Sequence, residues 1–88
     1  MIVRVDRRFE KDTDRISNKN LLEKIAQTIE KVRKCNHPRE IRNLKKIKGH
    51  KSAYRIRIGD YRLGFFFENN TVICTRLLSR KDIYKYFP

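Results

Sequence analysis

The stretch from residue 54 to residue 68 constrains the fold most, because its pattern predicts two short strands joined by a tight turn. Apolar and basic residues alternate from Arg55 to Ile58, which is the period of a half-buried strand. Gly59-Asp60 comes next, and glycine adopts positive φ without steric cost. These two residues can therefore form the whole loop of a hairpin, and such a short loop fixes the register of its strands.

That register sorts the side chains of the hairpin onto two faces. Arg57 lies opposite Arg62, Arg55 lies opposite Gly64, and Ile58 pairs with the first residue after the turn. Like charges directly opposite each other destabilise a strand pair, so the arginine face requires an anion. A solvated basic face is the simpler interpretation, but three arginines beside a glycine that admits a ligand favour a polyanion site. The apolar face carries Tyr54, Ile56, Ile58, Tyr61, Leu63, Phe65 and Phe67.

Length and charge limit the possible functions further. The chain has 88 residues, enough for a single domain over residues 1–88 with one modest core. It carries 23 Lys and Arg against 10 Asp and Glu, a net charge of +13, which attracts nucleic acid, anionic membranes or acidic proteins. No apolar run approaches a membrane span and no signal-peptide pattern is present, so we expect a cytoplasmic protein without membrane association.

The cysteines and histidines suggest no metal centre. Cys35 and Cys74 lie far apart, a spacing that fits neither a zinc site nor a disulfide framework. We expect both to be reduced and structural. His37 and His50 are expected in surface loops. No carboxylate cluster or metal-ligand spacing occurs, so we expect no metal and no small-molecule cofactor.

The N-terminal third predicts a strand followed by two helices. Residues 1–5 fit a short strand, and Asp6 can cap a short helix after it. Residues 18–34 have helical periodicity, and Asn20 with Glu23 resembles a capping box. The buried stripe of this long helix should consist of Leu21, Leu22, Ile25, Ile29 and Val32.

Residues 39–53 are predicted to form a connector. Its apolar residues Ile41, Leu44 and Ile47 should dock it on the domain. Its lysines either stay in water or contact phosphates at the rim of a binding site, and the two interpretations are equally open. These lysines are Lys45, Lys46, Lys48 and Lys51.

A third strand is expected over residues 71–78, antiparallel to the second strand of the hairpin. Regular pairing puts Val72 and Cys74 on the apolar face but also puts Arg76 there. Either a bulge shifts the register, or Arg76 lies near the sheet end and extends its head to water. In the regular register the arginine face receives Phe66, Ile73, Thr75 and Leu77.

The apolar residues on the arginine face imply that something covers part of it. Residues 79–87 predict a short helix, with Ser79 as its cap and Ile83, Tyr84 and Phe87 along one side. Folded back over the sheet, this helix carries Arg80 and Tyr84 toward the three arginines. The chain as a whole thus predicts an α+β fold in β-α-α-β-β-β-α order. The fold is expected to be a small antiparallel sheet with the two N-terminal helices packed on one face, plus the short C-terminal helix.

This order of elements, with LKKIKGHKSAYRIRIGDYRLGFFF and the ending SRKDIYKYF, resembles the RelE/ParE superfamily of bacterial and archaeal toxins over essentially the whole chain. The resemblance implies a toxin of a type II toxin–antitoxin pair, neutralised by an acidic antitoxin protein that wraps its basic surface. In the RelE branch the activity is cleavage of mRNA in the ribosomal A site. In the ParE branch it is poisoning of DNA gyrase.

The resemblance also implies which residues act. The two basic positions of the first hairpin strand fall on Arg55 and Arg57, and the arginine beginning the next strand falls on Arg62. The arginine after the last strand falls on Arg80, and the tyrosine of the final helix falls on Tyr84. Each position keeps a basic or phenolic group, which favours a ribosome-dependent, metal-independent endoribonuclease.

These residue types suit cleavage of RNA by its own 2′-OH. Guanidinium forks grip phosphate oxygens in pairs, so we assign Arg62 and Arg80 to the scissile phosphate. Arg55 and Arg57 bind it or its neighbours. Arginine is a poor general base, so Tyr84 is our candidate for the general base or for stacking on a splayed base, and the alternative is a small aromatic anchor.

Two other functions stay open at this point. A ParE-like gyrase inhibitor needs no acid–base group. A non-catalytic basic module would bind only RNA or an acidic protein.

Overall fold

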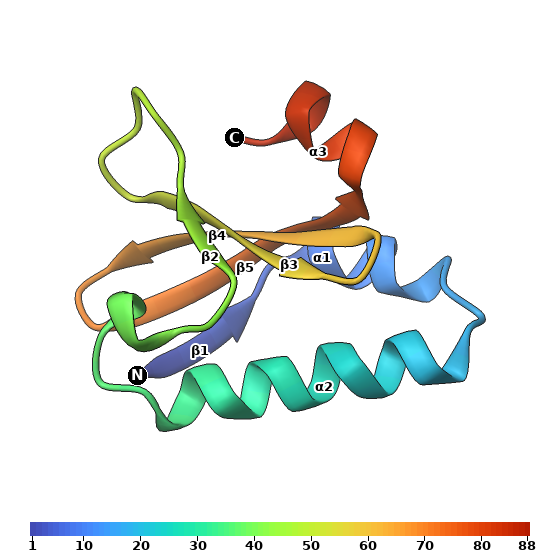
Figure 1. Ribbon diagram of the computed structural model, residues 1–88, viewed down its shortest axis with the longest axis horizontal. Helices are drawn as coiled ribbons and strands as arrows, with labels where there is room; N and C mark the ends of the chain where they lie inside the picture. Colours follow the sequence, from blue (N-terminus) through green and yellow to red (C-terminus); the bar gives the residue numbers. More distant parts are fainter.

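The computed structural model describes residues 1–88 as a five-stranded sheet with helices on both faces (Figure 1). Helices α1 and α2 lie against one face of the sheet, and α3 lies over the other. The α+β class and the order of the predicted elements are confirmed. No helix has the length and apolar character needed to cross a membrane. In chain order the elements are β1 (Ile2–Val5), α1 (Arg7–Asp14), α2 (Lys19–Lys34), the 3₁₀ turn η1 (Pro38–Glu40), β2 (Leu44–Lys46), β3 (Ala53–Ile58), β4 (Tyr61–Glu68), β5 (Thr71–Ser79) and α3 (Arg80–Tyr86).

The sheet is larger than the sequence predicts, and it is mixed. Its strand order is β1-β5-β4-β3-β2, and β1 runs parallel to β5 while all other neighbours are antiparallel. The predicted connector contains β2, in which Leu44 pairs with Ile56 and Lys46 pairs with Tyr54. With three residues, this edge strand is too short to show the alternation by which strands are predicted.

The hairpin formed by β3 and β4 has the predicted register. Arg57 pairs with Arg62 and Arg55 with Gly64, and Gly59 has a φ of 58° in the turn. The apolar face of this hairpin forms the centre of the main core between the sheet and α2. The fully buried members of the hairpin in that core are Ile56, Ile58, Leu63 and Phe65.

Helix α2 follows the predicted stripe, with two differences at its N-terminal end. Ile25 and Val32 are buried, whereas Leu22 keeps 36% of its surface exposed at the border of the stripe. The cap is Asn18, whose side-chain oxygen accepts a hydrogen bond from the amide of Leu21 at 3.1 Å. Asn20 is therefore not the cap, because the helix has already begun at Lys19 and the amide three residues after Asn18 is the one that needs a partner.

A bulge in β5 decides which of its side chains reach the core. Gly64 pairs with Arg76 and Phe65 pairs with Cys74, so Thr75 has no partner on β4. Of the two alternatives for Arg76, the bulge is confirmed. The extra residue shifts the side-chain alternation by one position. Leu77 is therefore in the main core, and its predicted place on the arginine face is wrong.

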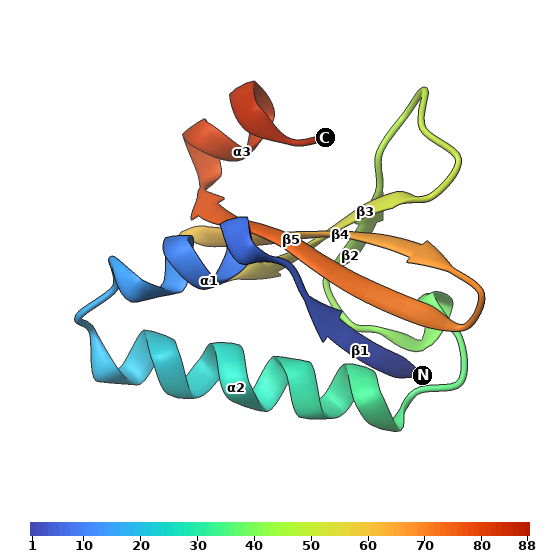
Figure 2. The same ribbon diagram turned by 180° about the vertical axis from the view of Figure 1, so that it is seen from behind.

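Helix α1 covers the edge of β5 beyond the end of β1, as Figure 2 shows. The buried carboxylate of Asp12 accepts hydrogen bonds from the amide of Leu77 at 2.9 Å and from Nε and Nη2 of Arg76 at 2.8 and 3.2 Å. We call this group the edge clasp. The clasp supplies a hydrogen-bond acceptor for the amide of Leu77, which lies at the strand edge beyond the reach of β1. A buried N–H without an acceptor would destabilise the fold.

Helix α3 is docked on the arginine face by a small second core. Ile83 and Phe87 pack with Ala53, and the ring of Phe87 lies directly over Gly64. A Cβ atom at Gly64 would come within 2.7 Å of that ring, so the absence of a side chain there makes the docking possible. The predicted cap is confirmed, since the hydroxyl of Ser79 accepts a hydrogen bond from the amide three residues later at 3.3 Å.

Candidate functional site

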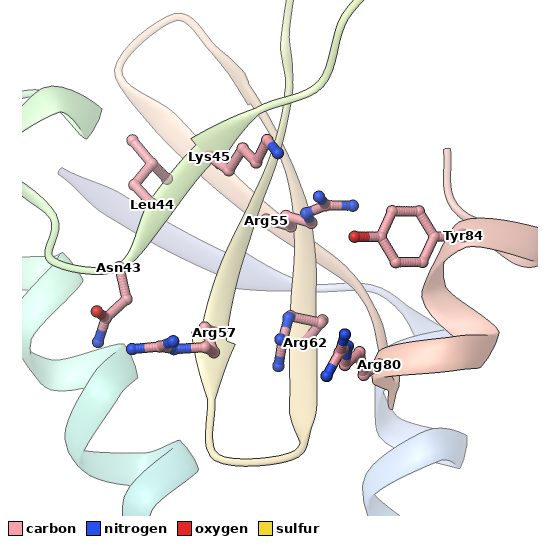
Figure 3. Close-up of a pocket in the computed structure, with 8 residues that line it drawn as sticks. All are labelled: Asn43, Leu44, Lys45, Arg55, Arg57, Arg62, Arg80 and Tyr84. Atoms are coloured by element: carbon pink, nitrogen blue, oxygen red, sulfur yellow. The ribbon is translucent and has the colours of Figure 1, made fainter.

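The arginine face contains a cavity of about 580 Å³ between β2 and α3, which we call the cationic cleft (Figure 3). All five side chains to which the sequence assigns catalysis line it, together with one of the four predicted RNA-binding lysines. The cleft is lined by Asn43, Leu44, Lys45, Arg55, Arg57, Arg62, Arg80 and Tyr84.

Arg62 lies at the centre of the cationic cleft and is held by main-chain oxygens. Its Nη1 atom donates hydrogen bonds to the carbonyls of Gly59 at 3.0 Å and Tyr61 at 2.9 Å, both in or beside the β3–β4 turn. Partial burial lowers the pKa of Arg62, and the positive charges of Arg57 and Arg80 lower it further. The side chain still keeps its charge at neutral pH, as arginine does throughout proteins. A bound anion would therefore lower the electrostatic repulsion that already exists among these arginines.

Arg80 is placed beside Arg62 by the start of α3. Its amide donates a hydrogen bond to the carbonyl of Asp60 at 2.9 Å, which joins the helix start to the β3–β4 turn. In Figure 3 the side chains of Arg80 and Arg62 lie next to each other. Two guanidinium groups thus face the same space, which is the arrangement that the predicted binding of one phosphate requires.

No carboxylate neutralises the arginines of the cationic cleft. The molecule has three ion pairs, and all of them lie elsewhere. Unpaired guanidinium groups on one concave surface form a site for a polyanion. The ion pairs are Arg8–Asp6, Arg33–Glu30 and Arg76–Asp12.

Tyr84 extends from α3 over Arg55. The Cζ atom of Arg55 lies 4.4 Å from the centre of the phenol ring, a cation–π contact, and 64% of the surface of Tyr84 is exposed. Tyr84 is therefore not part of the buried core that docks the last helix, although its ring contacts β3 through Arg55. Ile83 and Phe87 anchor α3, and the phenol remains accessible to a ligand in the cationic cleft.

Arg57 points away from the Arg62–Arg80 pair and toward Asn43, as Figure 3 shows. Its amide donates a hydrogen bond to the carbonyl of Asn43 at 3.1 Å. Asn43 has a φ of 61°, in the left-handed region that asparagine tolerates better than most residues. Sequence reasoning missed Asn43. Its tolerance of this conformation next to an apolar-basic strand is the only signal that could have indicated it.

The other predicted RNA-binding lysines do not reach the cationic cleft. Lys45 lines it, but Lys46, Lys48 and Lys51 line a separate hollow of about 410 Å³ in the loop between β2 and β3. His50 belongs to that loop as well. Any contact of these three lysines with RNA would therefore lie outside the cleft.

Comparison with known proteins decides the family. Residues 3–84 match the family described as the ParE toxin of the type II toxin-antitoxin system, parDE. The chain belongs to the RelE/ParE superfamily of type II toxin–antitoxin toxins. The resemblance found in the sequence is thereby confirmed.

Two relatives of this toxin are archaeal and similar over nearly the whole length. Toxin RelE3 of Methanocaldococcus jannaschii is 38% identical over 81 residues, which make up 91% of each chain. A chain in the RelB–RelE antitoxin–toxin complex from Methanococcus jannaschii is 35% identical, with a TM-score of 0.81 and coverage of 97% of this toxin and 99% of that chain.

A third comparison extends the fold beyond close sequence similarity. A chain in the archaeal RelE–RelB complex from Pyrococcus horikoshii OT3 has a TM-score of 0.72 at 20% identity, covering 90% of this toxin and 93% of that chain. At this identity the similarity shows the fold alone. The layered sheet that carries the cationic cleft is thus shared by proteins of quite different sequence.

Proposed function

We propose that this toxin is a ribosome-dependent endoribonuclease that cleaves mRNA and thereby inhibits translation. The observation that carries the proposal is the cationic cleft, which is lined by four arginines without carboxylate partners and by an exposed phenol. A phosphodiester is the ligand that matches planar, forked, permanently charged donors.

In this proposal Arg62 and Arg80 hold the scissile phosphate. As the 2′-OH attacks, negative charge builds up on the phosphate oxygens, and preorganised donors stabilise that charge. Arg55 and Arg57 bind the same phosphate or its neighbours. Tyr84 accepts the proton of the 2′-OH or stacks on a splayed base, and the ribosome supplements this sparse acid–base equipment.

The lysines extend the proposed RNA surface in two directions. Lys45 binds a phosphate next to the scissile one, because it lines the same cleft. Lys46, Lys48 and Lys51 contact RNA outside the cleft, since Lys46 ends β2 and the other two lie on the β2–β3 loop that follows. Contacts of this kind add affinity without sequence preference and weaken as salt rises.

We also propose an acidic antitoxin protein as the partner that neutralises the toxin. The net charge of +13 provides a complementary surface for it. Two of the similar archaeal chains described above were determined in a complex of RelE with RelB. An antitoxin that covers the cationic cleft would exclude RNA by occupying the same arginines.

The decisive experiment removes the arginines assigned to the scissile phosphate. We expect Arg62→Ala or Arg80→Ala to lower mRNA cleavage on programmed ribosomes by about 100- to 1,000-fold, the usual loss when one donor to a developing oxyanion is removed. Both variants should also relieve growth arrest. Arg7→Ala is the matched control, because Arg7 is exposed on α1 and its substitution removes one positive charge at a site away from the cleft. Full toxicity in both cleft variants would rule out the catalytic roles.

A second function is favoured by one specific finding, since the matching family description is that of a ParE toxin. A ParE-like toxin would inhibit DNA gyrase and would need no acid–base chemistry. Induced cells would then show DNA damage before protein synthesis stops, whereas an mRNA-cleaving toxin stops protein synthesis first. Binding to programmed ribosomes without cleavage would instead indicate a non-catalytic basic module.

A further inference from the structure

A second cavity adjoins the cationic cleft on the side of α2. It has a volume of about 520 Å³ and lies between the C-terminal half of α2 and the segment that leads from η1 into β2. Asn43 and Arg57 line both cavities, so the two spaces share a border. We call this second space the side cavity.

The side cavity differs chemically from the cationic cleft. Val32 and Ile56, both buried, and the half-buried Ile41 give it an apolar floor. Thr28 and Asn43 supply neutral polar groups, and charges of both signs complete the lining, from Lys31, Glu40 and Arg42. A phosphate would gain little from such a floor. A planar heterocycle, with apolar faces and a polar edge, has the matching distribution of surface.

We infer that the side cavity holds a nucleobase of the RNA strand whose phosphate lies in the cationic cleft. The inference rests on the proposed function, because it requires RNA in the cleft. Arg57 stands at the border and points toward Asn43 rather than toward Arg62 (Figure 3). It can therefore bind the phosphate that links the nucleotide in the cleft to the nucleotide whose base enters the side cavity.

Asn43 is the residue placed to discriminate among bases. Its backbone is held in a left-handed conformation, and its carbonyl accepts the hydrogen bond from Arg57. Its exposed side-chain amide makes no hydrogen bond within the protein, which leaves both a donor and an acceptor for the edge of a base. An asparagine amide pairs most completely with adenine, through the N6 and N7 positions.

Cys35 provides a direct reporter of occupancy. It lines the side cavity and is half-buried, and its thiol donates a hydrogen bond to the carbonyl of Lys31 at 3.2 Å. The other cysteine, Cys74, is buried in the core, and burial raises its pKa to about 12. A maleimide therefore modifies Cys35 selectively in the folded toxin, because the thiolate is the reactive form.

The test measures how fast a maleimide modifies Cys35 in the presence of a tetranucleotide made of 2′-O-methyl RNA, which cannot be cleaved through its 2′ position. We expect modification to slow by about tenfold at ten times the dissociation constant, as mass action requires of a covered site. A matched tetranucleotide with abasic positions binds the cleft through its phosphates and should leave the rate within about twofold at the same saturation.

Three outcomes would overturn the inference. Equal slowing by both oligonucleotides would mean that the backbone, not a base, covers Cys35. No slowing at about 1 mM oligonucleotide, above the usual range of nonspecific nucleic-acid dissociation constants, would mean that the side cavity stays empty. Slowing by the antitoxin but not by the oligonucleotide would make the cavity a protein-docking site.

Two variants test the same inference through cleavage. Thr28→Phe should fill the side cavity and lower cleavage by about tenfold, the smallest usual effect of a steric change in a pocket. Gln27→Phe is the matched control, since Gln27 is the exposed neighbour on α2 that does not line the cavity. Asn43→Gly keeps the left-handed backbone and removes the side-chain amide. The preference for one base over the others at the cut positions should therefore change by about tenfold.

These experiments separate the inference from the proposed function. A parent toxin that cuts no RNA on programmed ribosomes contradicts the proposed function, whatever Cys35 reports. A parent toxin that cuts RNA, with unchanged cut positions in Asn43→Gly and full activity in Thr28→Phe, contradicts the base site alone.

Discussion

Two arginines on neighbouring strands have opposite surroundings. Arg76, in the edge clasp, donates two hydrogen bonds to Asp12, and those bonds raise its pKa. Arg62, in the cationic cleft, has carbonyl partners only, and burial together with Arg57 and Arg80 lowers its pKa. The arginine that stabilises the fold is given a carboxylate within the chain. The arginine assigned to function is left without one, so that its charge is available to a ligand.

The largest expected effect comes from breaking the edge clasp. Asp12→Ala would leave the Arg76 guanidinium, whose side chain is 19% exposed, and the amide of Leu77 without an acceptor. Removing one partner of a buried pair costs about 3–5 kcal/mol, so urea unfolding should show a loss of this size. Asp14→Ala, an exposed carboxylate on the same helix, should change the free energy of unfolding by less than about 0.5 kcal/mol. Equal losses in the two variants would show that the clasp contributes nothing specific.

An intermediate effect is expected at Gly64, which lies between the two arginine environments. It pairs with Arg55 on one side and Arg76 on the other, and the Phe87 ring covers it. Gly64→Ala should cost about 1–3 kcal/mol by overpacking and should lower cleavage, because α3 carries Arg80.

A double-mutant cycle isolates the contact behind that prediction. Phe87→Ala removes the ring that the new Cβ would meet, so adding Gly64→Ala to it should cost less than Gly64→Ala costs in the parent. Additive losses in urea unfolding would show that the ring over Gly64 is not the cause.

The smallest expected effect has the opposite sign. Arg62→Ala should raise the free energy of unfolding by about 0.2–1 kcal/mol at low salt, because it removes a like-charge pair with Arg57 across the strands. The gain should vanish in high salt, which screens exposed charges. Arg76→Ala, by contrast, should destabilise the toxin at every salt concentration. A loss of stability in Arg62→Ala at low salt would contradict the distinction between the two arginines.

The hairpin and the five clustered side chains could be predicted because their positions depend on local chemistry. Gly59-Asp60 fixes the register of β3 and β4, and that register places Arg55, Arg57 and Arg62 on one face. Ser79 begins the helix that adds the remaining two members. The register and the helix start depend on neighbouring residues, whereas the fold-back of α3 is predicted from the apolar residues of the arginine face, which need a cover.

The features that could not be predicted depend on contacts between distant segments. Thr75 bulges in a strand whose alternation alone gives a different register, and Asp12 meets its partners more than 60 residues along the chain. Strand β2 forms because β3 offers it an edge, not because three residues have strong strand character. The side cavity, and the place of Asn43 in its lining, likewise depend on α2 packing beside β2 and β3.

The β3–β4 turn has a role beyond reversing the chain. The carbonyls of Gly59 and Tyr61 accept hydrogen bonds from the side chain of Arg62. The carbonyl of Asp60 accepts one from the amide of Arg80. Three consecutive peptide groups thus set the spacing between two guanidinium groups, one near the start of β4 and one directly after β5, which meet at the open end of the β4–β5 hairpin. The number of residues in this turn is consequently more restricted than the identity of their side chains. One inserted residue would separate the two positive groups without removing either of them.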